Sequence, residues 1–263
     1  MAINRVKSAI LSLFFASSLA QGAALPDLWP LTLKAPQPSE LNERCAALAV
    51  QTPPELKPAL QFQQIFLKII ASGASKAQPL EPDWVAPLRG LVAADRPEDA
   101  MGHGVAEVAR AWLARVGMLK IDAGLHQFYR HHVRFPDRFS EIEPALPEGL
   151  RRDPWGRPWV YKTGAPQGLA KLSDQRYQIG PALFPNLGSF KDAVGDRNPL
   201  PQKWTLLPVR IGDRPALEFR IPNGSTATVQ PGGKVDSFTL LFIGDTWALM
   251  AGPDQLFALR FSN

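Results

Sequence analysis

The chain has almost no cysteine: Cys45 is the only one among 263 residues. A single cysteine has no intramolecular partner, so a small fold stapled by disulfides is excluded. We predict that Cys45 lies inside a helix as a small buried residue; the alternative is an exposed thiol that bridges two molecules. The fold therefore depends on apolar burial, and with 45% apolar residues the chain can bury one sizeable core or two modest ones.

Dense basic tracts are lacking as well. The net charge is +5, and removal of residues 1–20 would lower it to +3, because that stretch holds Arg5 and Lys7 but no acidic residue. A charge this small does not indicate a nucleic-acid-binding protein. The sequence also has no serine in a nucleophile-elbow context and no glycine-rich phosphate-binding loop.

No set of side chains in the sequence predicts catalysis, a cofactor or a metal. His126, His131 and His132 cluster, but their spacings differ from the i+3 and i+4 spacing of ligands on one helix face. Carboxylate pairs such as Glu141 and Glu143 lie in polar stretches, which favours solvated surface charge over an acid/base pair. We therefore predict that the protein is not an enzyme and has no catalytic, cofactor-binding or metal-binding residues.

The first residues have the order of a secretory signal: basic residues, an apolar stretch at 9–20, and small residues at Ser18 and Ala20. The apolar stretch is too short to span a bilayer comfortably, so the pattern predicts a cleaved signal peptide at 1–20. Cleavage is expected after Ala20 or, alternatively, after Ala24; an uncleaved N-terminal membrane helix is the other interpretation. The protein is thus predicted to be periplasmic or secreted, with no stable membrane insertion once the signal is removed.

Residues 21–104 combine a proline-rich lead-in with two predicted helices, at 39–51 and 52–73. Ser39 and Thr52 are suitable N-cap residues for them. Each helix has a one-sided apolar stripe, as expected of helices that cover a core. A further short element is predicted near the sequence DWVAPLRGLV.

The longest helical signal covers 105–131, where apolar residues recur at spacings near 3.6. Gly117 and Gly124 predict a bend in it, and the preceding sequence MGHG predicts a turn. From Trp204 onward the period becomes strand-like, with Gly- and Pro-containing turns between short strands. This pattern predicts a small β-sandwich or barrel-like module at 201–263.

The sequence DPWG predicts a rigid turn. The Asp153 carboxylate can accept a nearby backbone N–H, Pro154 presets φ for the second position, and Gly156 suits the fourth. The following aromatic run and the later DQRYQI read as two strands of a hairpin. We interpret the turn as a structural signature rather than a site; its residues are Asp153, Pro154, Trp155 and Gly156.

Four features follow one another between about 105 and 190: a long helix with an aromatic exit up to Pro136, the DPWG turn, an aromatic strand, and a return strand that ends in Gly180-Pro181. This order resembles the soluble domain of the major pseudopilin of type II secretion systems. The resemblance implies an α+β fold with N-terminal helices, in which a long helix packs on a small antiparallel sheet. That family has a calcium loop after the return strand. Here only Asp192 and Asp196 offer carboxylates, too few for a cation that takes six or more oxygens, so no metal site is carried over.

The family's basic leader, Gly-Phe cleavage step and uninterrupted apolar helix have no counterpart in this sequence, so its mode of filament packing is not implied. Residues 201–263 are similar in rhythm to the β-domain of the type II clamp protein and of pilus-assembly lipoproteins. The two resemblances imply an exported, non-enzymatic accessory or interaction protein of a type II secretion or type IV pilus-like system. Its partners would be other envelope or secretion-system proteins.

An alternative interpretation is a secreted hydrolase or carbohydrate-binding protein on the same scaffold. Four tryptophans could form an aromatic platform for a sugar or a peptide, although tryptophans at strand positions are more often core residues. They are Trp155, Trp159, Trp204 and Trp247.

Overall fold

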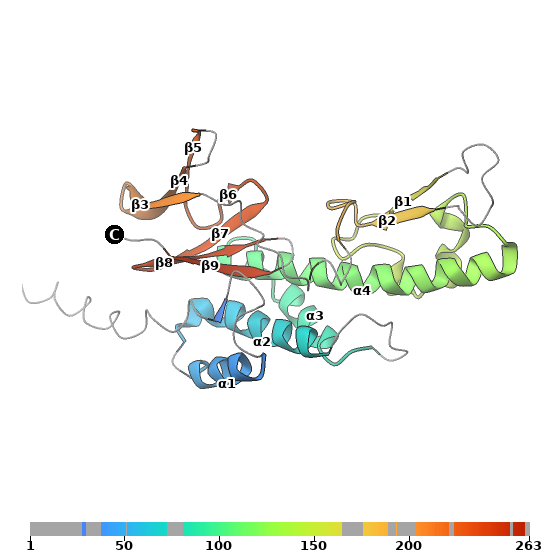
Figure 1. Cartoon of the computed structure of the whole chain (residues 1–263), viewed down its shortest axis with the longest axis horizontal. Helices are drawn as coiled ribbons and strands as arrows, with labels where there is room; N and C mark the ends of the chain where they lie inside the picture. Colours follow the sequence, from blue (N-terminus) through green and yellow to red (C-terminus); the bar gives the residue numbers. More distant parts are fainter. Residues whose placement is uncertain are drawn as a thin grey trace, which may run out of the picture. The chain divides into compact units, whose positions relative to one another are not determined.

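The computed structural model has an α+β fold, as predicted (Figure 1). The predicted signal peptide at 1–20 lies outside the described residues. The residues that the structure describes are 28–29, 38–50, 52–72, 81–164, 176–188, 193, 204–220, 224–252 and 255–260.

The chain forms two compact units, and each gathers stretches that are separate in the sequence. Unit 1 contains the described residues up to Leu67, residues 96–105 and the described residues from Trp204 onward. Unit 2 contains the described residues of 68–95 and 106–195.

The helical elements are α1 (Pro38–Leu48), α2 (Lys57–Ala71), α3 (Val85–Ala93), α4 (Ala100–His132) and the 3₁₀ turns η2 (Pro54–Leu56), η3 (Phe139–Glu141), η4 (Glu143–Ala145) and η5 (Glu148–Leu150). The strands are β1 (Val160–Thr163), β2 (Tyr177–Gly180), β3 (Thr205–Ile211), β4 (Arg214–Arg220), β5 (Thr226–Val229), β6 (Lys234–Val235), β7 (Phe238–Ile243), β8 (Trp247–Ala251) and β9 (Leu256–Arg260). Within the described part of the chain, every helix is either too short or too polar to cross a membrane.

The first helices of unit 1 lie near their predicted positions, but their caps differ. Cys45 is a fully buried free cysteine in α1, as predicted, and burial raises the pKa of its thiol to about 11. Ser39 is not an N-cap, because α1 already begins at Pro38. Thr52 does not cap the next helix either: its hydroxyl donates to the Leu48 carbonyl at 2.7 Å and closes the end of α1 instead.

The second helix, α2, is buried on more than one side, contrary to the one-sided stripe that the sequence predicts. Gln63 is only 4% exposed, and its side-chain amide donates to the Leu28 carbonyl at 2.5 Å. The neighbouring Trp29 is fully buried and stacks on Trp247 of β8, with ring centroids 6.2 Å apart. The lead-in therefore contributes two core residues, of which Leu28 contacts α2 and Trp29 contacts β8. The spacing of apolar residues within α2 could not indicate these contacts.

The β-module of unit 1 consists of two antiparallel sheets, ordered β3-β4-β5 and β6-β7-β8-β9 (Figure 1). The two sheets share one apolar core, to which Leu217 and Phe219 come from the first and Phe238 and Leu240 from the second. The β7–β8 register shifts between Leu240 and Phe242, and Leu241 packs against Gly104 of α4. A Cβ at Gly104 would lie 2.2 Å from Leu241 Cδ2, so the glycine permits this close approach.

The long helix α4 begins at Ala100, earlier than the sequence predicts. The Asp99 carboxylate accepts the Met101 N–H at 3.1 Å, so the helix has an N-cap, and the MGHG sequence is helical rather than a turn. α4 then passes through Gly117 and Gly124 as one uninterrupted helix. Both glycines are packing positions: a Cβ at Gly117 would lie 3.0 Å from the Trp159 ring, and one at Gly124 would lie 3.3 Å from Leu146.

Unit 2 is built around the part of α4 that it contains. β1 and β2 pair antiparallel, with Val160 opposite Gly180 (Figure 1). Residues of α4, of the loop that follows it and of the hairpin form one buried cluster, which consists of Ala114, Ile121, Leu125, Phe135, Ile142, Leu146, Trp159 and Ile179.

Two tyrosines at the edge of this cluster have raised pKa values. Tyr161 donates to the Pro136 carbonyl at 2.9 Å, and burial raises its pKa to about 12. Tyr177 donates to Asp122, and burial, followed by this carboxylate, raises its pKa as well. The folded state thus holds these protons more tightly than the unfolded chain, whose tyrosines titrate near 10.

We therefore expect the tyrosine contribution to be complete below about pH 10 and to be lost as the pH rises from there toward the folded pKa values. Urea unfolding between about pH 8 and 11 measures this loss. The double variant Tyr161→Phe/Tyr177→Phe should unfold with a shallower alkaline slope. An unchanged slope would contradict this assignment. The raised pKa of the Cys45 thiol in unit 1 also makes stability fall as the pH rises, beginning at a lower pH than for the tyrosines. Cys45→Ala in the same background separates this contribution.

Candidate functional site

The DPWG turn forms a closed hydrogen-bonded corner. The Gly156 N–H donates to the Asp153 carbonyl at 2.8 Å, and the Asp153 N–H donates to the Arg157 carbonyl at 2.8 Å. Oδ1 of Asp153 accepts the N–H groups of Trp155, at 3.0 Å, and Arg157, at 2.8 Å. Asp153 is 3% exposed, so its carboxylate organises the turn from inside the protein.

The second oxygen of Asp153 connects the turn to the far end of the hairpin. Its Oδ2 accepts the Ala182 N–H at 2.9 Å, directly after the Gly180-Pro181 step. The chain then folds back on β2, and a Cβ at Gly180 would lie 2.4 Å from the Pro185 carbonyl oxygen. One buried carboxylate thus holds together two short sequence motifs that lie far apart along the chain.

A chain of polar contacts supports Trp155 on the same corner. The Trp155 indole N–H donates to the Glu107 carboxylate of α4 at 3.0 Å. Arg110 contacts both Glu107, at 2.5 Å, and Asp95, at 2.6 Å. Burial alone would lower the pKa of Arg110, but its hydrogen bonds to Asp95 and Glu107 outweigh that effect and raise it. The ring of Phe184 packs on Trp155, with centroids 5.5 Å apart.

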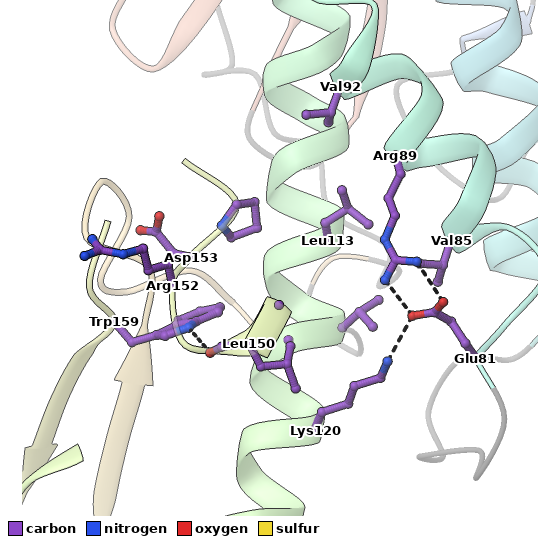
Figure 2. A pocket seen from close by; sticks show the side chains of 14 residues that line it. Glu81, Val85, Arg89, Val92, Leu113, Lys120, Leu150, Arg152, Asp153 and Trp159 are labelled. Atoms are coloured by element: carbon purple, nitrogen blue, oxygen red, sulfur yellow. Dashed lines mark hydrogen bonds and ion pairs between the residues drawn. The ribbon is translucent and has the colours of Figure 1, made fainter. Parts of the chain in front are cut away.

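A groove lies beside this corner, within unit 2 (Figure 2). α3 and Glu81 form one wall, α4 forms the floor, and the loop that contains the DPWG turn forms the other wall. Its apolar lining is made by Val85, Val92, Leu113, Val116, Leu150, Pro154 and Trp159. Trp159 is fixed in place by its indole N–H, which donates to the Leu150 carbonyl at 2.9 Å.

An ion cluster crosses the α3–α4 side of the groove (Figure 2). Arg89 donates to both oxygens of Glu81 at 2.8 Å, and Lys120 of α4 donates to Oε1 of the same carboxylate at 3.0 Å. The hydrogen bonds from Arg89 and then from Lys120 hold the pKa of Glu81 below its usual range.

The histidines that cluster in the sequence do not form a site. His126 is exposed and lies 3.7 Å from Asp122, while His131 and His132 are exposed at the end of α4. Among the described residues, no group of three or more His, Cys, Asp or Glu side chains is arranged to hold a metal ion. Asp192 and Asp196 lie outside the described residues.

The four tryptophans of the platform alternative are divided between the two units. Trp155 and Trp159 belong to unit 2, whereas Trp204 and Trp247 belong to unit 1. Trp159 and Trp247 are buried in their cores, and Trp204 packs edge-on against Phe219 and Phe238. Trp155 is half-buried.

Sequence reasoning missed the groove completely, because its residues come from three separate stretches and only tertiary packing brings them together. One feature of the sequence could have indicated the groove: Glu81, Arg89 and Lys120 are charged residues within or next to strongly apolar segments. Comparison of the chain with protein-family models, with curated proteins and with solved structures gives no match in any of the three.

The backbone conformation of Gly156 allows the structural role of the turn to be tested by mutation. Gly156 has φ +77°, and a Cβ there would meet nothing within 4 Å, so any penalty for a side chain comes from backbone strain and not from a clash. We expect Gly156→Val to lower the free energy of unfolding by about 1–3 kcal/mol and Gly156→Asn to lower it by less than about 1 kcal/mol. Denaturant titration measures both. Equal effects of Val and Asn would contradict the strain argument, and unchanged stability with loss of a ligand would indicate a functional loop.

Proposed function

We propose that this protein is an exported, non-enzymatic accessory or interaction component of a type II secretion or type IV pilus-like envelope system. One observation carries the proposal: the buried carboxylate of Asp153 bridges the DPWG turn to Ala182, directly behind Gly180-Pro181. These are two of the features on which the resemblance to the major pseudopilin rests. Their direct connection supports the view that they act as one structural unit beside the long helix.

The predicted signal peptide at 1–20 and the β-module add support of a second kind. Export would bring the mature chain to the compartment of envelope machines, and the end strands of the two sheets in the β-module are candidate surfaces for a partner strand. β3 carries Pro208 at its centre, a residue that lacks a backbone N–H, and β9 is largely buried, so the partly exposed strand β5 is better suited to such pairing.

A deletion strain tests the proposed function. We expect loss of the gene to reduce the set of proteins released to the medium or the number of surface pili, as measured by mass spectrometry of the medium and by electron microscopy. Complementation by the full chain should restore them, and a chain that lacks residues 1–20 should not. Unchanged secretion and piliation in a strain that exports the protein normally would refute the proposal. Secretin and secretion-ATPase genes beside this one would support it.

Self-assembly gives a further prediction. The pseudopilin filament depends on a long apolar N-terminal helix, and here the predicted signal is instead followed by α1 and α2, whose residues Cys45 and Phe62 are already buried in unit 1. We therefore expect the protein without residues 1–20 to form a monomer or a small closed oligomer. Light scattering and negative-stain microscopy measure this, and filaments formed by that protein alone would contradict it.

A further inference from the structure

The groove beside the DPWG turn combines an apolar lining with basic side chains that keep unused hydrogen-bond donors. Arg89 and Lys120 share one carboxylate, that of Glu81, so two cations face one anion there. A guanidinium has five N–H donors and an ammonium has three, so both side chains retain donors beyond those given to Glu81. Their side chains are 58% and 43% exposed, so a ligand can reach them.

The opposite wall adds no available anion. Arg152 of this wall donates to the Gly156 carbonyl at 3.0 Å, and its guanidinium points away from Arg89 and Lys120 (Figure 2). Asp153 also lines the groove, but it is buried and its oxygens accept three backbone N–H groups. The accessible charge of the groove is therefore positive, because Arg89 and Lys120 together outweigh the single carboxylate of Glu81.

An apolar lining next to two basic side chains selects one kind of occupant. Val92, Leu113 and Trp159 can bury an apolar side chain, while Arg89 and Lys120 can bind carboxylates that flank it. A basic peptide would be repelled, and an acidic peptide without an apolar residue would leave the floor exposed to water.

We propose that this groove binds an acidic segment of a partner protein, in which one or two large apolar residues are flanked by Asp or Glu. The inference rests on the proposed function in one respect, that the ligand is a protein partner. The choice of an acidic and apolar segment follows from the groove itself.

Fluorescence anisotropy with a labelled peptide of about ten residues, Leu and Phe at its centre and Glu and Asp on both sides, tests the proposal on the full mature chain. Two control peptides of equal length carry Ser in place of Leu and Phe, or Lys in place of Glu and Asp. We expect the acidic-apolar peptide alone to bind, and we expect its binding to weaken at high salt because the walls contribute charge.

Val92 is half-buried in the groove wall and provides matched charge variants. We expect Val92→Glu to weaken binding of the acidic-apolar peptide about tenfold or more and Val92→Lys to strengthen it. Lys120→Gln should weaken binding several-fold, whereas Arg176→Gln, an exposed residue outside the groove, should leave it unchanged. Thermal melting of each variant checks that the fold is retained.

Several outcomes would overturn the inference. The inference would be wrong if the acidic-apolar peptide did not bind, or if either control peptide bound equally well. It would also be wrong if Val92→Glu and Val92→Lys weakened binding equally. A dimer in sedimentation that both Val92 variants dissociate would also overturn it, because a second copy of the chain would then cover the groove. Peptide binding without any effect of the gene deletion on secretion or piliation would refute the proposed function alone, whereas a secretion defect without peptide binding would refute the groove inference alone.

Discussion

Replacement of Asp153 by alanine is expected to destabilise the protein by about 4 kcal/mol. The carboxylate is buried and accepts three backbone N–H groups, from Trp155, Arg157 and Ala182. Alanine would leave these donors without partners inside the protein, and each unsatisfied buried donor costs about 1–3 kcal/mol. Chemical denaturation followed by tryptophan fluorescence measures the change.

Asp153→Asn is the matched control. The asparagine oxygen can still accept the Trp155 and Arg157 N–H groups, but its NH₂ group would face the Ala182 N–H, donor against donor. We expect a loss of about 1–2 kcal/mol, between the wild type and Asp153→Ala. If Asp153→Ala cost less than about 1 kcal/mol, the carboxylate would not hold the corner together.

Gly180→Ala is expected to cost about 2–4 kcal/mol, because the added methyl group would meet backbone atoms that cannot move independently. Its Cβ would lie 2.4 Å from the Pro185 carbonyl oxygen and 2.9 Å from the carbonyl carbon. The loop after β2 would have to move outward, which also strains the bond from the Ala182 N–H to Asp153. Equilibrium unfolding measures the loss of stability.

Gly164→Ala serves as the control for this change. Gly164 lies just after β1, and a Cβ there would come no closer than 3.6 Å to the Arg176 carbonyl oxygen, an ordinary contact. We expect its effect to stay within about 0.5 kcal/mol. Similar losses in the two variants would mean that general loss of glycine flexibility, and not the close approach at Gly180, sets the cost.

The order of elements was accessible to sequence reasoning wherever a local period or a turn signal was strong. The alternating residues after Trp204 correctly predicted short antiparallel strands, and the apolar recurrence around Ile121 predicted the long helix. The DPWG sequence predicted the turn at Asp153, because Pro154 and Gly156 restrict the backbone locally.

Local reasoning failed at three positions in unit 1. The Thr52 hydroxyl was predicted to cap the helix that follows it, but it closes the one before it. Gln63 interrupts the predicted one-sided stripe with a polar side chain, yet it is buried, and its amide donates to the Leu28 carbonyl. Gly102 and Gly104 suggested a turn at MGHG, but α4 includes them, and Gly104 gives Leu241 its room.

By itself, the sequence determined the α+β class, the burial of Cys45 and the corner at Asp153, because periodicity, helix burial and turn chemistry depend on residues close together in the chain. Tertiary structure alone decided that Asp153 reaches Ala182 and that Glu81, Arg89 and Lys120 meet beside an apolar groove. Such contacts join stretches that lie far apart in the sequence. Which residues meet depends on how α3, α4 and the hairpin pack in unit 2, and no local sequence pattern indicates that packing.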